Sequence, residues 1–300
     1  MTFGIYPRLR ALQDVRVLSV CLNLPGPAAL ARLRDMGAFC QKIEPLPAPD
    51  GHADPMQLFC PGLYEALHTG IEVHRADLKS SSGKASLREL LSQTDVLLTS
   101  FRPSALARLG MDWTKLHQQF PRLCMVSIVG GSGQKAEHPG HDLTYLAASG
   151  LVPDLSLPPT LYADMAGALM ASEAVLLLLL KRSLAGKGSR RMVSLGEAAA
   201  HLALPRDWRL TGKNTILGGA HAGYRLYPCK NGKVAVAALE PHFSRALCEA
   251  TGLAWHGAVM MLESLTHEHF QIYFQGRTCR QIKSLAAQRD IPLLVMPGLG

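Results

Sequence analysis

The sequence has few aromatic residues, few charged residues and none of the common phosphate-loop or hydrolase motifs. Aromatic residues make up 6% and charged residues 18% of the 300 positions, whereas 48% are hydrophobic. This composition is typical of a globular chain with a sizeable core and excludes a mainly disordered one. No GxxxxGK[ST] segment occurs, which excludes a P-loop. The absence of Gly-x-Ser-x-Gly disfavours a serine hydrolase.

Cysteine and histidine are not spaced as metal ligands. The seven cysteines are widely spread and include no CxxC pair, which favours reduced thiols in a reducing compartment. His267 and His269 flank Glu268 in a helical region, and a spacing of two places side chains on different faces of a helix. We therefore predict no metal site.

The sequence also lacks a recognisable leader or membrane segment. Residues 1–20 contain no basic region followed by an apolar one, so no secretory signal is predicted. The most hydrophobic run, residues 165–180, is short for a bilayer span and carries Glu173 near its centre. We interpret it as a buried core helix and expect a cytoplasmic protein with no membrane partner.

Positive charge is in excess but is not concentrated. Lysine and arginine number 31 against 23 aspartates and glutamates, a net charge of +8, which suggests an anionic partner. A nucleic-acid-binding chain usually gathers its basic residues on one helix or interleaves them with aromatic residues. Here they are scattered, so we expect a small anionic ligand and no nucleic acid.

Hydrophobic patterning in the first half alternates strands with helices. The predicted strands are Val15–Val20, Cys40–Glu44, Asp95–Thr99 and Leu123–Val129; helices are predicted from Pro25 to Gly37, over Lys84–Gln93 and over Pro103–Leu109. This alternation predicts an α/β fold with a Rossmann-like parallel sheet flanked by helices. Segment 45–68, rich in proline and glycine, is predicted to be a long connection.

A smaller second domain is predicted after the sheet. An apolar helix is expected from Asp164 to Arg182, ended by Gly186. We assign residues 1–210 to the large domain, 211–223 to a linker and 224–300 to the smaller domain, which has a strand at 233–239 and helices over 242–288.

Three ionisable residues stand at the ends of predicted elements. His141 precedes Asp142 at a turn that opens a helix, Asp164 begins the apolar helix, and Glu240 ends a strand before Pro241. Each alone is equally well explained as a cap or turn residue. Together, two acid–base groups and a partnering carboxylate suit proton abstraction next to a carbonyl.

At these residues the sequence resembles the family III CoA-transferases, and more closely their α-methylacyl-CoA racemase branch. The specific segments are GHD-x-x-YLA-x-SG at 140–150 and ALEP-x-F at 238–243. The LPGP and FRP segments agree with them, and the resemblance runs from about Leu12 to the end of the chain.

The resemblance implies roles for the three ionisable residues. In the racemase branch, Asp164 and His141 would be the two acid–base groups, and Glu240 would partner the histidine. In the transferase branch, Asp164 would instead be a nucleophile that forms an acyl anhydride. A degenerate member that binds acyl-CoA without turnover is the third alternative.

The resemblance further implies CoA binding and an interlocked homodimer. The matching segments place CoA contacts at Pro25, Gly26, Phe101, Arg102 and Arg108. CoA enters as part of the acyl-CoA substrate, and no other cofactor is implied. Where the family usually has a pair of basic residues, this sequence has Ile71 and Glu72, so we expect weakened CoA binding. The sequence also ends earlier than is usual in the family. We therefore expect a divergent member.

Overall fold

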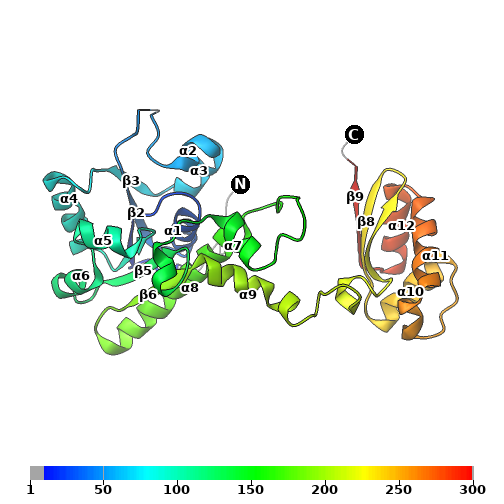
Figure 1. Ribbon diagram of the computed structural model, residues 1–300. Helices are drawn as coiled ribbons and strands as arrows, with labels where there is room; N and C mark the ends of the chain where they lie inside the picture. The colour runs from blue at the N-terminus through cyan, green and yellow to red at the C-terminus, as the bar shows by residue number, and fades with distance from the viewer. Residues whose placement is uncertain (1–9, 50, 299–300) are drawn as a thin grey trace. The chain divides into compact units, whose positions relative to one another are not determined.

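The computed structural model of the chain describes residues 10–49 and 51–298. The chain divides into two compact units, Met1–Ala203 and Leu204–Gly300. Figure 1 shows the parallel sheet and its helices in the first unit and the antiparallel sheet in the second.

A six-stranded parallel sheet forms the centre of the first unit. The spatial order of its strands is β3-β2-β1-β4-β5-β6, and every neighbouring pair is parallel. The strands are β1 (Arg16–Ser19), β2 (Phe39–Glu44), β3 (Glu72–Arg75), β4 (Val96–Thr99), β5 (Cys124–Val129) and β6 (Arg190–Ser194). This is the strand order of doubly wound nucleotide-binding folds. It confirms the predicted α/β class with a Rossmann-like sheet.

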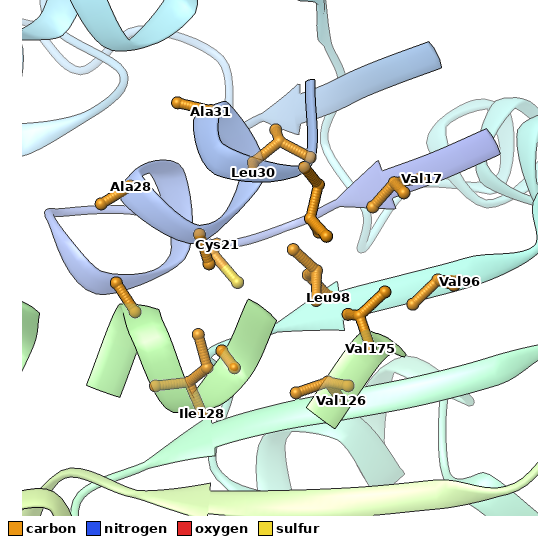
Figure 2. Close-up of a cluster of buried hydrophobic side chains, with 14 of the residues drawn as sticks. Val17, Cys21, Ala28, Leu30, Ala31, Val96, Leu98, Val126, Ile128 and Val175 are labelled. Carbon is orange, nitrogen blue, oxygen red and sulfur yellow. The ribbon is translucent and has the colours of Figure 1, made fainter. Parts of the chain in front are cut away.

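Helices cover both faces of this sheet, because alternate strand residues point to opposite sides. On β1, Val17 packs in a cluster with α1 (Pro25–Asp35) and α8 (Tyr162–Ala185). Its neighbour Leu18 packs in a second cluster with α4 (Ser81–Ser92), α5 (Pro103–Leu109) and α6 (Trp113–Gln119). Figure 2 shows the first cluster, where Leu98 and Val126 from the strands lie near Val175 of α8.

The hydrophobic pattern predicts the central strands and misses both edge strands, β3 and β6. The residues of β3 are half-buried or exposed, and β6 begins with the exposed Arg190, Arg191 and Met192. Central strands of a parallel sheet are buried on both faces and appear as apolar runs, whereas edge strands are not. Segment 45–68, predicted as a connection, contains two short helices, α2 (Pro55–Phe59) and α3 (Pro61–His68).

The apolar helix α8 is longer than its sequence pattern predicted. It spans Tyr162–Ala185, ends at the left-handed Gly186, and places Asp164 within its first turn rather than at its start. By length and composition it could cross a membrane. One face packs on α1 and β5 in the core of the first unit, as expected for a core helix. The other face exposes leucines: Leu169, Leu176, Leu177, Leu180 and Leu184.

Two shorter helices complete the first unit. The helix α7 (Asp142–Ala148) follows a single turn of 3₁₀ helix, η1 (Gly133–Glu137), and packs against α8. The helix α9 (Leu195–Asp207) directly follows β6 and runs across the boundary between the two units.

The second unit is an antiparallel sheet with helices on one face. Its strands are β7 (Tyr224–Cys229), β8 (Gly232–Ala237) and β9 (Leu293–Pro297), in the order β7-β8-β9. Its helices are α10 (Pro241–Thr251), α11 (Ser264–Gln275) and α12 (Cys279–Arg289). Tyr227 and Val234 point into the core with these helices, whereas Leu226 and Leu294 on the opposite face are 62% and 67% exposed. Residues 211–223, the predicted linker, lie inside this unit and contain a short 3₁₀ turn at 216–218.

Candidate active site

A cavity of about 160 Å³ opens at the carboxyl edge of the parallel sheet, between the ends of β1 and β4. The loop after β1 contributes Asn23 and Pro25, and the loop after β4 contributes Arg102. Connections from these two strands run to opposite faces of the sheet, which leaves a crevice where open α/β folds bind their ligands. The rest of the wall consists of Leu22, Ser100, Ile128, Val129, Gly130, Ala136, His138, Gly140, His141, Tyr145, Asp164 and Leu195.

Asp164 lines this cavity, and its backbone N–H forms a hydrogen bond to the first residue of α7. Its N–H donates to Oδ1 of the buried Asp142 at 2.9 Å. Burial and, secondly, the negative charge of Asp142 raise the pKa of Asp164 from 3.8 to about 6. A carboxyl group that titrates near neutral pH can both accept and donate a proton during a reaction. Asp164 therefore has the ionisation expected of an acid–base residue.

His141 lines the same cavity and immediately precedes α7. Thr144 fixes its backbone: His141 N–H donates to the Thr144 hydroxyl at 3.2 Å, and that hydroxyl donates to the His141 carbonyl at 2.7 Å. The His141 residue is exposed. The fold thus brings the two sequence-predicted acid–base residues of the first unit to one cavity.

Tyr145 is a cavity residue that the sequence analysis did not single out. Its hydroxyl lies between two glycines, because a Cβ atom at Gly130 or Gly140 would be 2.5 or 2.6 Å from it. Burial, and then the charge of Asp164, raise the pKa of Tyr145. Its place in the GHD-x-x-YLA segment is the sequence signal that could have identified it.

The residues predicted to contact CoA are divided among three places. Pro25 and Arg102 line the cavity of Asp164. Phe101 lines a neighbouring cavity of about 370 Å³, and Arg108 lines a third one between α4, α5 and α6. Gly26 is buried, and a Cβ there would be 2.1 Å from the Cβ of Cys21. Its position is explained by the close approach of α1 to the end of β1.

The structure places Ile71 and Glu72 away from the cavities at the carboxyl edge. Ile71 is buried in the core cluster that includes α1, and Glu72 is the first residue of β3, where its carboxylate accepts from the Gln41 side chain at 3.0 Å. Because the strands are parallel, Glu72 is at the amino edge of the sheet and Arg75 at the carboxyl edge. The expected loss of CoA affinity through Ile71 and Glu72 has no support from this geometry.

Glu240 belongs to the second unit, where it directly precedes α10 and is exposed. Its carboxylate has no hydrogen-bond partner in the described part of the chain. The pairing of Glu240 with His141 remains a prediction.

The described residues contain one group of side chains with the spacing of a metal site: Glu44, Asp54 and His68, with ligand atoms within 4.8 Å of one another. The ammonium group of Lys42 contacts all three, at 2.8 Å from Glu44, 2.6 Å from Asp54 and 2.9 Å from His68 Nε2. Lys42 therefore occupies the position that a metal cation would take.

Comparison with known proteins identifies the family of this chain. Residues 12–295 match the sequence model of CoA-transferase family III. The chain belongs to CoA-transferase family III. This membership confirms the resemblance seen in the GHD-x-x-YLA and ALEP segments.

Named relatives within family III carry out two kinds of reaction. The chain is 31% identical to the human alpha-methylacyl-CoA racemase over 262 residues, which are 81% of this chain and 65% of the racemase. It is 27% identical to the acetyl-CoA:oxalate CoA-transferase of Acetobacter aceti over 79% of this chain and 65% of that one. The chain thus spans about two thirds of the length of these curated relatives.

A solved structure has a similar fold. A hypothetical protein from Mycobacterium tuberculosis superposes with a TM-score of 0.78 at 22% identity, over 96% of this chain and 84% of that one. This similarity supports the fold, with its parallel sheet and smaller antiparallel domain.

Proposed function

We propose that this chain acts on acyl-CoA thioesters and epimerises a 2-methylacyl group by moving its α-proton between two side chains. The observation that carries the proposal is the shared cavity of Asp164 and His141, in which the pKa of Asp164 is about 6. Epimerisation needs one proton acceptor and one proton donor on opposite faces of the α-carbon. Asp164 takes the proton and leaves an enolate, and His141 returns a proton to the other face; the reverse direction exchanges their roles.

Other cavity residues have supporting roles in this proposal. The Arg102 guanidinium, which lines the same cavity, is a hydrogen-bond donor for the thioester oxygen as it gains negative charge. Glu240, from the second unit, would orient the imidazole of His141. The similarity to a racemase at 31% identity supports this chemistry.

The nucleotide end of CoA is proposed to lie in the neighbouring cavity of about 370 Å³. Leu22 belongs to the walls of both cavities, so a single extended ligand can reach from one to the other. The lining of the larger cavity is mainly apolar, including Ile43, Leu78 and Phe101, and suits a flat base. Its charged residues are Glu44, Asp77 and Lys79, of which Lys79 is the proposed partner of a phosphate. We propose no cofactor besides CoA.

The second candidate function is CoA transfer, favoured by the similarity to an acetyl-CoA:oxalate CoA-transferase. Here the Asp164 carboxylate attacks the thioester carbonyl, the C–S bond breaks, and CoA leaves as the thiolate while an acyl anhydride forms. A third candidate is binding of acyl-CoA without turnover.

Incubation with a 2-methylacyl-CoA in heavy water tests the leading proposal. We expect deuterium at the α-carbon and loss of optical purity, detected by mass spectrometry and chiral analysis. Loss of optical purity should disappear in Asp164→Asn and in His141→Ala, because one base alone can exchange the α-proton only on its own face. An active wild type whose His141→Ala variant still epimerises at the same rate would refute the two-base mechanism.

The transfer alternative predicts a different pattern. An acyl-CoA and a second carboxylic acid should then yield a new acyl-CoA, detected by chromatography. This activity should be lost in Asp164→Asn and retained in His141→Ala, because only the carboxylate acts as nucleophile. Absence of both activities with a panel of acyl-CoAs that bind would favour the non-catalytic alternative.

We also propose a homodimer. The exposed leucines of α8 and the open face of the second unit's sheet, with Leu226 and Leu294, are apolar surfaces of the kind that oligomers bury. Light scattering should give twice the chain mass of 32.4 kDa at micromolar concentration. A stable folded monomer would contradict the proposal.

A further inference from the structure

Asn23 adopts an unusual backbone conformation at the wall of the candidate active site. It lies in the loop between β1 and α1, and its φ angle is +64°. Among residues other than glycine, asparagine tolerates this left-handed region best, because its short side chain avoids the worst clashes. Asn23 lines the cavity that also contains Asp164, His141 and Arg102.

The side-chain amide of Asn23 has nothing to bind within the protein. The residue is half-buried, and across residues 10–49 and 51–298 its only hydrogen bond is made by its backbone N–H. The amide is not among the fully buried polar atoms that lack a partner, so it is open to the cavity and free to bind water or a ligand there. A ligand in the cavity would supply the missing partner.

A buried charge network holds the backbone of Asn23. Its N–H donates to Oδ1 of Asp54 at 3.1 Å, and Asp54 is completely buried. The other oxygen of Asp54 accepts from Lys42 Nζ at 2.6 Å, and Lys42 also contacts Glu44 and His68. The Asp54 carboxylate additionally accepts from the Met56 N–H at 3.0 Å, at the start of α2.

This network is held in place because each of its charges is neutralised by the others. Lys42 and Asp54 have side chains with 0% exposure, and moving either one would leave an unpaired charge in the core. The orientation of Asp54, and with it the turn at Asn23, is therefore fixed before a substrate arrives. Such preorganisation is what a substrate-binding donor requires.

We propose that the side-chain amide of Asn23 binds the thioester oxygen of the acyl-CoA substrate, and that Asp54 is the positioning residue that holds it there. This inference rests on the proposed function, because it takes an acyl-CoA as the ligand. An amide N–H at this oxygen would share the growing negative charge with Arg102.

Asn23→Gly is the decisive substitution. Glycine adopts a positive φ without strain, so this variant keeps the turn and removes only the amide. We expect calorimetric titration to show about five-fold weaker binding of a 2-methylacyl-CoA, the effect of one hydrogen bond, and unchanged binding of free CoA. Asn23→Asp, which also tolerates the turn, should weaken acyl-CoA binding further because it places a carboxylate against the oxygen.

The outcomes separate this inference from the proposed function. Wild type that binds neither ligand would overturn both. Wild type that binds acyl-CoA while Asn23→Gly binds it equally well would overturn only the inference, since asparagine would then serve the turn alone. An equal loss for acyl-CoA and free CoA would place the contact on the CoA portion and would also overturn it.

Asp54→Asn tests the positioning role. It keeps an oxygen for the Asn23 N–H but removes the charge that pairs with Lys42. We expect weaker acyl-CoA binding and faster hydrogen exchange at the Asn23 amide. In the double variant with Asn23→Gly, acyl-CoA affinity should fall no further than in Asn23→Gly alone, because Asp54 acts only through Asn23. Additive losses would refute the positioning role, and if Asp54→Asn does not fold, the two Asn23 variants still decide the contact.

Discussion

The raised pKa of Asp164 should make wild type less stable than Asp164→Asn at alkaline pH. In the folded chain the pKa is about 6, whereas the reference value is 3.8, and the causes are burial and then the charge of Asp142. A carboxyl with a raised folded-state pKa contributes stability that is fully present below the unfolded pKa. That contribution is lost as the pH rises through the folded pKa. Above pH 6 the protein therefore carries an ionised group that folding disfavours.

The size of this effect follows from the two pKa values. Their difference of about 2 corresponds to about 3 kcal/mol at most. Because Asp164 is only partly buried, solvent screening reduces this figure, and we expect about 1–2 kcal/mol. Asp164→Asn has nearly the same shape and does not titrate. Its stability relative to wild type should therefore rise by this amount between pH 4 and pH 8.

Urea unfolding followed by circular dichroism at pH 4, 6 and 8 measures this difference directly. Asp154→Asn is the matched control, because Asp154 is an exposed loop aspartate in the same unit. The stability of Asp164→Asn should rise relative to this control as the pH increases from 4 to 8. If the two variants showed the same pH profile, the Asp164 carboxyl would not be destabilised in the folded chain, and its assignment as an acid–base group near neutral pH would lose its physical basis.

Three further predictions concern residues around the site and the core. Asp142→Asn keeps the acceptor for the Asp164 N–H and removes a negative charge. Because burial is the larger of the two causes that raise the pKa of Asp164, we expect this substitution to lower that pKa by about 1 at most, and the acidic limb of the pH profile of the exchange rate to move with it. A rise would contradict this prediction. Lys42→Met should lower the free energy of unfolding by about 3–5 kcal/mol, measured by urea denaturation, because two buried carboxylates lose their cation. Gly26→Ala should lower the melting temperature in calorimetry, because its Cβ would meet the Cβ of Cys21 at 2.1 Å; an unchanged melting temperature would mean that α1 can shift freely.

Much of the fold could be predicted from local patterns. The central strands β1, β2, β4 and β5 are apolar runs because they are buried on both faces, and proline marks the start of α1 and α5. The edge strands β3 and β6 have no such run, since one side of each lacks a neighbour. Their pairing with β2 and β5 depends on the folded sheet, so a pattern within ten residues cannot indicate it.

The candidate site was predicted only in part, for a related reason. The sequence by itself determined that His141 and Asp164 lie near the starts of helices, and the GHD-x-x-YLA and ALEP segments determined the family. Which side chains surround Asp164 was decided by the sheet order, because the loops after β1 and β4 meet only where the strand order reverses.

The electrostatics of the site are likewise a product of the tertiary structure. Asp142 raises the pKa of Asp164 across 22 positions of sequence, and Asp54 holds Asn23 across 31. Burial and charge proximity exist only once distant segments are packed together, and they determine how strongly a carboxylate or an ammonium is stabilised. The sequence by itself determined which ionisable groups the chain has and the family it belongs to. Only the packed structure decided which of these groups meet, how deeply they are buried and therefore how they titrate.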